Sequence, residues 1–173
     1  MASGNDGDAG SKVLKAMAGV ESGVLGGAFM LIWLGLVSLL EGGSAWSIAN
    51  LLASTFYGEA ALRRGFRWTT LSGVALHVIM TAMAGLVFGL AVDGIASRSR
   101  VMFLGLAAGM LWYFLGLDVF WKHLNPIVPG YFQGSGMLLA HLGLGYFLAG
   151  RADRLRWPGG DCPAEFPHLR SHT

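Results

Sequence analysis

The chain has 173 residues, of which 54% are hydrophobic and only 13% are charged. Ordinary soluble domains are about 45–50% apolar and about 25% charged, so this composition excludes a typical soluble domain and indicates a membrane protein. The formal net charge is +2, and the twelve Lys and Arg residues are spread between apolar segments, which gives no support for nucleic-acid binding. A single cysteine, Cys162, excludes an internal disulfide framework.

The first apolar segment follows a polar start. Residues 1–20 open with small, polar and acidic side chains and include Lys12 and Lys15, so they are predicted to form a mobile tail. Residues 22–40 carry no charge and approach the ~20 residues that a membrane-spanning helix needs. A cleavable signal peptide is the competing interpretation, but its apolar core is usually only about 7–15 residues long. The segment is therefore predicted to be the first crossing.

A shorter segment at residues 45–62 has a different pattern. Gly42 and Gly43 end the preceding helix, and Ser44 is placed to cap the next one. One helical face carries Ile48, Leu51, Leu52, Thr55 and Phe56. Other faces carry Asn50, Ser54, Gly58 and Glu59. Aromatic residues lie near both ends, so the segment is predicted to be an amphipathic helix at the membrane surface. A re-entrant segment buried in protein is the alternative.

Three further apolar runs are predicted to cross the membrane, at residues 68–92, 101–121 and 131–150. Pro126 and Pro129 separate the last two, because proline interrupts a continuous helix. Residues 151–173 contain three prolines and no apolar periodicity, so they are predicted to be extended or disordered. The predicted fold class is therefore an all-α, polytopic membrane protein: a four-helix membrane domain at residues 21–150, with the interfacial amphipathic helix between its first two spans.

The distribution of positive charge predicts the orientation. One side of the membrane receives Lys12, Lys15, Arg98, Arg100, Arg151, Arg154 and Arg156. The other receives Arg63, Arg64, Arg67 and Lys122. Because cytoplasmic loops carry the excess of Lys and Arg, both termini are predicted to be cytoplasmic.

Small residues four positions apart recur in each predicted crossing. They are Gly23 and Gly27, Gly85 and Gly89, Gly105 and Gly109, and Gly145 and Ala149. Such pairs form flat faces on which helices approach closely. All four helices have the feature and all four need neighbours, so we expect contacts inside the bundle; a dimerisation interface is the alternative.

His77 is the strongly polar residue inside the second crossing, and His141 lies inside the fourth. These two helices run in the same direction, and both histidines lie about 14–15 Å from the same membrane face at 1.5 Å per residue, so the two side chains can meet. Two imidazoles from two helices are what axial ligation of haem b requires. The plainer interpretation is that neutral histidines hydrogen-bond a neighbouring helix through Thr81, Ser72 or a backbone carbonyl. We expect this structural role and no cofactor; a haem or metal site is one alternative, and proton or solute handling is another.

Two further clusters are weaker candidates. Asp118, Lys122 and His123 lie near the outer face, where an Asp118–Lys122 ion pair four residues apart is expected instead of a polar site. The C-terminal tail contains Cys162, His168 and His172, a thiolate and two imidazoles of the kind that bind zinc or copper. The flanking prolines argue against a preformed metal site there.

Several segments together resemble a known type of protein. They are LHVIMTAMAGLVFGL, AAGMLWYFLGL, the pair Asn125-Pro126, and LLAHLGLGYFLAG. This layout, over residues 23–150, resembles a loose group of functionally uncharacterised bacterial inner-membrane proteins with four crossings. The resemblance implies a bacterial cytoplasmic membrane location and the four-helix layout, and it carries over no functional residue.

The predicted function is non-catalytic: a structural or accessory subunit that packs in the lipid bilayer with itself or with a larger membrane complex. A haem-binding redox subunit using His77 and His141 is one alternative, and a small transporter or channel component is another. Phosphate-binding loops, nucleophile elbows, zinc-protease motifs and dinucleotide fingerprints are absent from the sequence, which argues against an enzyme.

Overall fold

The structure is a computed structural model that describes residues 4–92, 95, 97–131 and 135–152. All regular structure in these residues is helical. Three segments are long and apolar enough to cross a membrane: Ala9–Leu40, Trp68–Ala91 and Arg98–Leu124. A fourth apolar helix, Gly136–Gly150, is shorter. The described chain is therefore all-α and built around long apolar helices, as the composition predicts.

Helix α1, Gly4–Leu40, is the longest helix of the described chain. Its end at Leu40 agrees with the predicted first crossing, but its beginning corrects the prediction that residues 1–20 form a mobile tail. Residues from Gly4 onward are helical, and Ala18 and Gly19 are buried. Gly19 lies against Gly85 and Gly89 of helix α3, so the end of the predicted tail is packed against the rest of the protein.

Helix α3, Trp68–Ala91, begins and ends within one residue of the predicted second crossing. It packs on α1 through the predicted small residues. A methyl group added at Gly85 would lie 2.8 Å from the Cα of Gly23, and one added at Gly27 would meet the Thr81 side chain. The two glycine pairs thus form the contact between α1 and α3, inside the molecule.

Helix α4, Arg98–Phe114, and helix α7, Ser135–Ala152, form a second close pair. A methyl group added at Gly105 would lie 2.8 Å from the Cβ of Ala149 and would also meet the carbonyl of Gly145. One added at Gly109 would meet the carbonyl of His141. Here too the small residues are used for packing within the chain.

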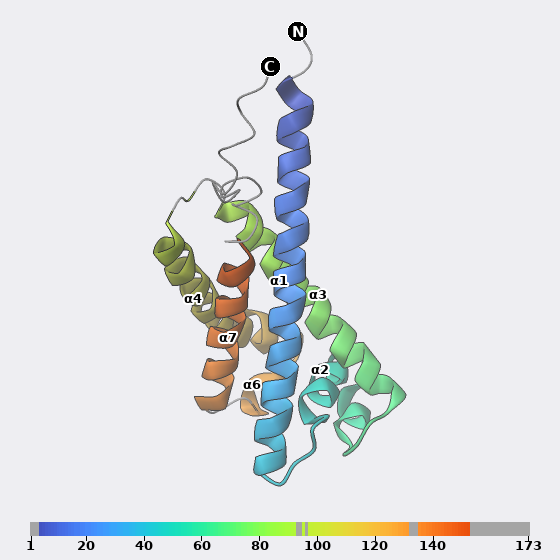
Figure 1. Ribbon diagram of the computed structural model, residues 1–173. Helices are drawn as coiled ribbons and strands as arrows, with labels where there is room; N and C mark the ends of the chain where they lie inside the picture. The colour runs from blue at the N-terminus through green and yellow to red at the C-terminus, as the bar shows by residue number, and fades with distance from the viewer. Residues whose placement is uncertain (1–3, 93–94, 96, 132–134, 153–173) are drawn as a thin grey trace, which may run out of the picture.

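Helices α1 and α7 are the inner pair. Figure 1 shows α7 between α4 and α1, and the main helix contacts are those of α4 with α7, α7 with α1, and α1 with α3. Trp33 Nε1 of α1 donates a hydrogen bond to the carbonyl of Gly136 in α7, over 2.9 Å. The four helices therefore follow the order α4, α7, α1, α3 instead of the order in which they occur along the chain.

The segment between α1 and α3 forms helix α2, Ser47–Tyr57, followed by a short 3-10 helix, η1, Gly58–Leu62. Its helical character agrees with the prediction, but the distribution of buried residues does not. Six consecutive residues of α2 are buried, including Asn50 and Ser54, whereas Phe56 is exposed. Asn50 and Ser54 face the protein because they hydrogen-bond other segments, so the helix is held by polar contacts as well as by its apolar face.

Helix α4 continues into η2, a π-helical stretch at Leu115–Trp121, and then into α5, Lys122–Leu124. The helix stops at Asn125, whose extended backbone (φ −152°, ψ 91°) is typical of a residue before proline. Helix α6, Ile127–Tyr131, follows. Tyr131, placed at the start of the predicted fourth crossing, therefore ends this separate short helix.

Candidate functional site

The structure brings His77 of α3 and His141 of α7 to the wall of one small cavity. Both side chains are buried, with 9% and 5% of their surface exposed. The count of residues along two helices that run in the same direction predicts that the two histidines lie at similar depth, and the fold places both at one cavity. Their shared cavity makes this part of the molecule the first candidate site.

Each of the two rings makes one hydrogen bond to a backbone carbonyl. His77 Nε2 donates to the carbonyl of Gly27 in α1 over 3.1 Å, and His141 Nδ1 donates to the carbonyl of Met137, one turn earlier in α7, over 2.9 Å. Thr81 is not the partner of the imidazole; its hydroxyl donates to the backbone carbonyl of His77 over 3.0 Å. Of the partners considered from the sequence, a backbone carbonyl is the one observed.

The cavity has a volume of about 40 Å³. Pockets for cofactors and drug-sized ligands usually measure about 300–1,000 Å³. A porphyrin between His77 and His141 therefore requires α3 and α7 to move apart. Tyr113 of α4 also packs edge-on against His141, with ring centroids 5.3 Å apart, and limits access from that side. In this packing the cavity between the two histidines is smaller than a porphyrin.

The π-helical stretch η2 forms part of the same wall, through Gly116, Leu117 and Trp121. Trp121 is buried, and Trp112 one turn before η2 also borders the cavity. Single π-helical turns inside α-helices occur frequently at functional sites, because they shift side chains out of the regular helical register. The irregular backbone here lies next to the paired histidines.

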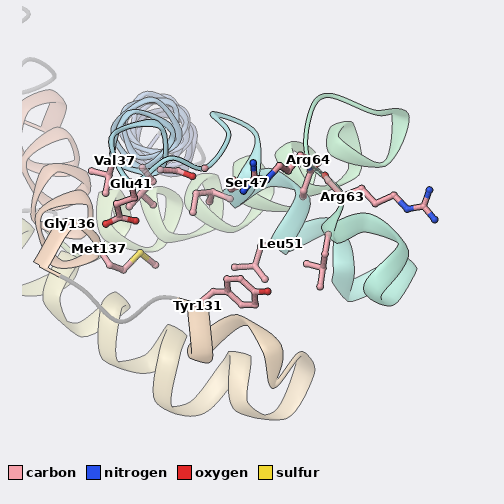
Figure 2. A pocket seen from close by; sticks show the side chains of 15 residues that line it. Val37, Glu41, Ser47, Leu51, Arg63, Arg64, Tyr131, Gly136 and Met137 are labelled. Atoms are coloured by element: carbon pink, nitrogen blue, oxygen red, sulfur yellow. Dashed lines mark hydrogen bonds between the residues drawn. The ribbon is translucent and has the colours of Figure 1, made fainter.

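A larger pocket of about 450 Å³ lies where the end of α1, helix α2 and the start of α7 meet, and Figure 2 shows it from close by. Glu41 and Tyr131 lie on different sides of it, and the Arg63 side chain extends away from it. Leu34, Ile48, Leu51 and Met137 give it an apolar wall. In the sequence, Arg63 and Arg64 contribute to the predicted orientation; that they line one pocket with Glu41 is seen only in the tertiary fold.

Asn50 and Asn125 are buried and hold separate segments of the chain together through their side-chain amides. The sequence alone does not identify this role. Asn50 Nδ2 donates to the carbonyls of Arg63 and Gly65, each over 2.9 Å, and its Oδ1 accepts from the Thr70 hydroxyl. This set of bonds fixes the turn between α2 and α3. An asparagine among the apolar residues of helix α2 is the available sequence signal, but it does not identify the partners.

Asn125 has the equivalent role at the other end of α2. Its Nδ2 donates to the Ser54 hydroxyl over 2.8 Å and to that of Thr55 over 3.2 Å, and its Oδ1 accepts from the backbone N–H of Ile127. Asn125 therefore joins the turn after α5 to helix α2, across about 70 positions of sequence.

The polar cluster at Asp118, Lys122 and His123 does not assemble into a site. Lys122 Nζ pairs with Asp118 Oδ1 at 2.9 Å, with 57% and 58% of the two side chains exposed. His123 Nδ1 hydrogen-bonds the carbonyl of Val119. The ion pair expected from the spacing is present, and the histidine is engaged by its own helix.

The candidate metal ligands Cys162, His168 and His172 lie outside the described residues, so their prediction stays a prediction. Within the part of the chain that the structure describes, no three His, Cys, Asp or Glu side chains gather in a way that could hold a metal ion. Comparison with models of protein families, with curated proteins and with solved structures finds no match for this chain.

Proposed function

We propose that the chain is an integral membrane protein that crosses the bilayer four times with both termini in the cytoplasm. Three helical segments have the required length and apolarity. Helix α7 has 18 residues, or about 27 Å at 1.5 Å per residue, slightly less than the ~30 Å hydrocarbon core. Its close packing on α4 and α1 supports a fourth crossing, because those two helices fix its depth. The bacterial cytoplasmic membrane, which the sequence resemblance implies, is the proposed location.

Within that membrane, the protein acts as a non-catalytic structural or accessory subunit. The observation that carries this proposal is the use made of buried polar side chains. His77, Asn50 and Asn125 each join separate segments of the chain by hydrogen bonds. Polar groups are costly inside a membrane, so those that are present usually have a role. Here their hydrogen bonds hold separate segments of the chain together, which supports a rigid scaffold.

The glycine-containing helix faces are buried against other helices of the same chain. A partner protein would therefore have to bind through another surface. The segment Arg98–Leu124 is the least enclosed of the three long helices, with 11% of its most apolar window buried against 33% for Ala9–Leu40. Phe103, Leu111 and Phe114 are exposed on it. This surface is open to lipid or to a partner subunit, either a second copy of the chain or another membrane protein.

Site-specific photocrosslinking in intact membranes tests the accessory role. A photoreactive residue is placed at Phe103, which is 72% exposed, and for comparison at Leu148, which is buried. We expect position 103 to yield a discrete crosslinked protein species and position 148 to yield crosslinks within the chain only. Lipid adducts alone at Phe103, and also at the exposed Ile32 and Val87, would contradict the proposal.

Labelling of Cys162 tests the orientation separately, because it is the single thiol of the sequence. In intact cells, an impermeant thiol reagent should leave Cys162 unmodified, and permeabilised cells should show modification. Modification in intact cells would place the C-terminus outside and reverse the proposed topology.

Haem binding between His77 and His141 is the alternative function. It is favoured by the shared cavity and opposed by its volume of about 40 Å³. Purification from haem-replete cells separates the two functions: a stoichiometric haem absorbance that is lost in His141→Phe supports the redox subunit, and a colourless, iron-free protein removes it.

A further inference from the structure

The cavity between the histidines is lined by a second kind of donor. Met30 of α1, Met80 of α3 and Met137 of α7 border the same space as His77 and His141. The lining therefore combines two imidazoles and three thioethers from three helices. It contains no carboxylate and no thiol.

The hydrogen bonds of the two histidines leave one nitrogen of each ring open. A carbonyl oxygen only accepts, so His77 Nε2 and His141 Nδ1 carry the protons, and in the neutral rings His77 Nδ1 and His141 Nε2 keep lone pairs. No described residue hydrogen-bonds either of these nitrogens. In the described part, Thr69 Oγ1 is the one fully covered polar side-chain atom without a partner, so the two open nitrogens are not fully covered by protein. Both histidines line the cavity, which is the space within the protein available to these nitrogens.

Donation of the other ring N–H to a backbone carbonyl is the usual arrangement of a metal-ligating histidine, because it fixes the ring and raises the basicity of the ligating nitrogen. His77 and His141 both have it. The two rings are therefore already oriented by hydrogen bonds before a ligand arrives.

The kinds of donor select the ion. Thioethers are soft ligands that favour Cu(I), whereas Mg²⁺ and Ca²⁺ prefer oxygen ligands. Structural and catalytic zinc sites draw on thiolates, imidazoles and carboxylates, and this cavity offers only imidazoles among them. A singly charged ion also loses less hydration energy on burial than a doubly charged one. A volume of about 40 Å³ accommodates a single ion or a single water molecule.

We propose that this cavity binds one Cu(I) ion, whose ligands are drawn from His77 Nδ1, His141 Nε2 and the thioether sulfurs of Met30, Met80 and Met137. The bound ion ties α1, α3 and α7 together at mid-depth. The π-helical stretch η2 closes the site with Trp121. This site is independent of the accessory role, because neither one requires the other.

Competition with a chromophoric Cu(I) chelator tests the proposal. The full chain, purified in detergent under argon, should withdraw one copper ion per chain from bicinchoninate, and X-ray absorption should show nitrogen and sulfur neighbours. The combined variant Met30→Leu, Met80→Leu, Met137→Leu keeps side-chain volume and should weaken binding by at least about tenfold, the effect typical of disturbing a metal's surroundings. Met83→Leu is the matched control, because Met83 is exposed on the same helix as Met80.

Three further results decide the site. Copper binding should raise the midpoint of thermal unfolding, because the ion binds only the folded chain. His141→Phe should abolish copper retention; if that variant does not fold, the methionine variant decides alone. Absence of copper retention, as for a water-filled cavity, would overturn the proposal. So would retention that survives the methionine changes, or that disappears in Cys162→Ser and thereby locates the copper in the C-terminal tail.

Discussion

The imidazole of His77 in α3 donates from Nε2 to the backbone carbonyl of Gly27 in α1 over 3.1 Å, across 50 positions of sequence. The glycine makes this possible, because a side chain at position 27 would meet Thr81, one turn after His77. The same close approach that lets the two backbones touch therefore brings the carbonyl within reach of the ring.

His77→Phe tests the strength of this bond. The carbonyl of Gly27 keeps its own helical hydrogen bond, so the variant leaves no unpaired backbone group. We expect a loss of about 0.6 kcal/mol in the free energy of unfolding and at most about 1.7 kcal/mol, the range measured for hydrogen bonds between membrane helices. Reversible unfolding in detergent measures it, with His123→Phe as the exposed control. A much larger loss of unfolding free energy in the copper-free protein would mean that the His77 ring does more than join two helices.

Gly85→Ala should separate α1 from α3. The added methyl group meets backbone atoms of Gly19 and Gly23, which cannot turn aside as a side chain can. We expect the overpacked contact to cost about 1–3 kcal/mol of unfolding free energy. Gly10→Ala is the control, since nothing lies within 4 Å of its added methyl group, and alanine favours a helix over glycine by about 1 kcal/mol. Equal stability of the two variants would refute the tight α1–α3 contact.

Asn50→Ala should destabilise the turn between α2 and α3. The variant leaves the carbonyls of Arg63 and Gly65 without their amide donor, and removes the acceptor of the Thr70 hydroxyl. We expect a cost of about 1–3 kcal/mol, the penalty for unsatisfied buried polar groups. Limited proteolysis should show faster cleavage between residues 58 and 67. Ser72→Ala removes the exposed Tyr57–Ser72 hydrogen bond and should leave the cleavage rate unchanged.

Lys122→Gln should have almost no effect on stability. Both partners of the Lys122–Asp118 pair are more than half exposed, and exposed pairs at this helical spacing contribute about 0.3–0.5 kcal/mol. We expect the thermal midpoint to change by no more than this small free energy implies. The part of its salt dependence that comes from this ion pair should disappear. A loss of several kcal/mol would reveal a functional cluster at Asp118 after all.

The long apolar helices follow directly from the sequence, because uncharged runs of sufficient length have few other structures available in lipid. Helix α1 ends at Leu40 and helix α3 begins at Trp68, as predicted. The helical start of α1 was not predictable from its polar composition, and the contact of Gly89 of α3 with Lys15 and Gly19 accounts only for the packed end of this stretch. The π-helical backbone of η2 likewise has no signature in the sequence.

The candidate site is predictable in part. Equal depth on two helices of the same direction makes it possible for His77 and His141 to meet, but only the fold shows that both border one cavity. The methionines are not identifiable in this way: Met80 borders the cavity, whereas Met83, three positions later in the same apolar run, is exposed. Asn50 and Asn125 present the same difficulty, because their partners are backbone groups brought close only by folding.

Helix α1 is much longer than a membrane is thick. Its 37 residues extend about 55 Å at 1.5 Å per residue, against about 40–45 Å for a whole bilayer with its headgroups. Figure 1 shows its N-terminal part projecting beyond the other helices. A straight helix anchored between α3 and α7 transmits their orientation to its tip. A fluorophore attached near residue 4 should therefore rotate slowly with the entire protein. A flexible terminus would instead let it rotate rapidly by itself.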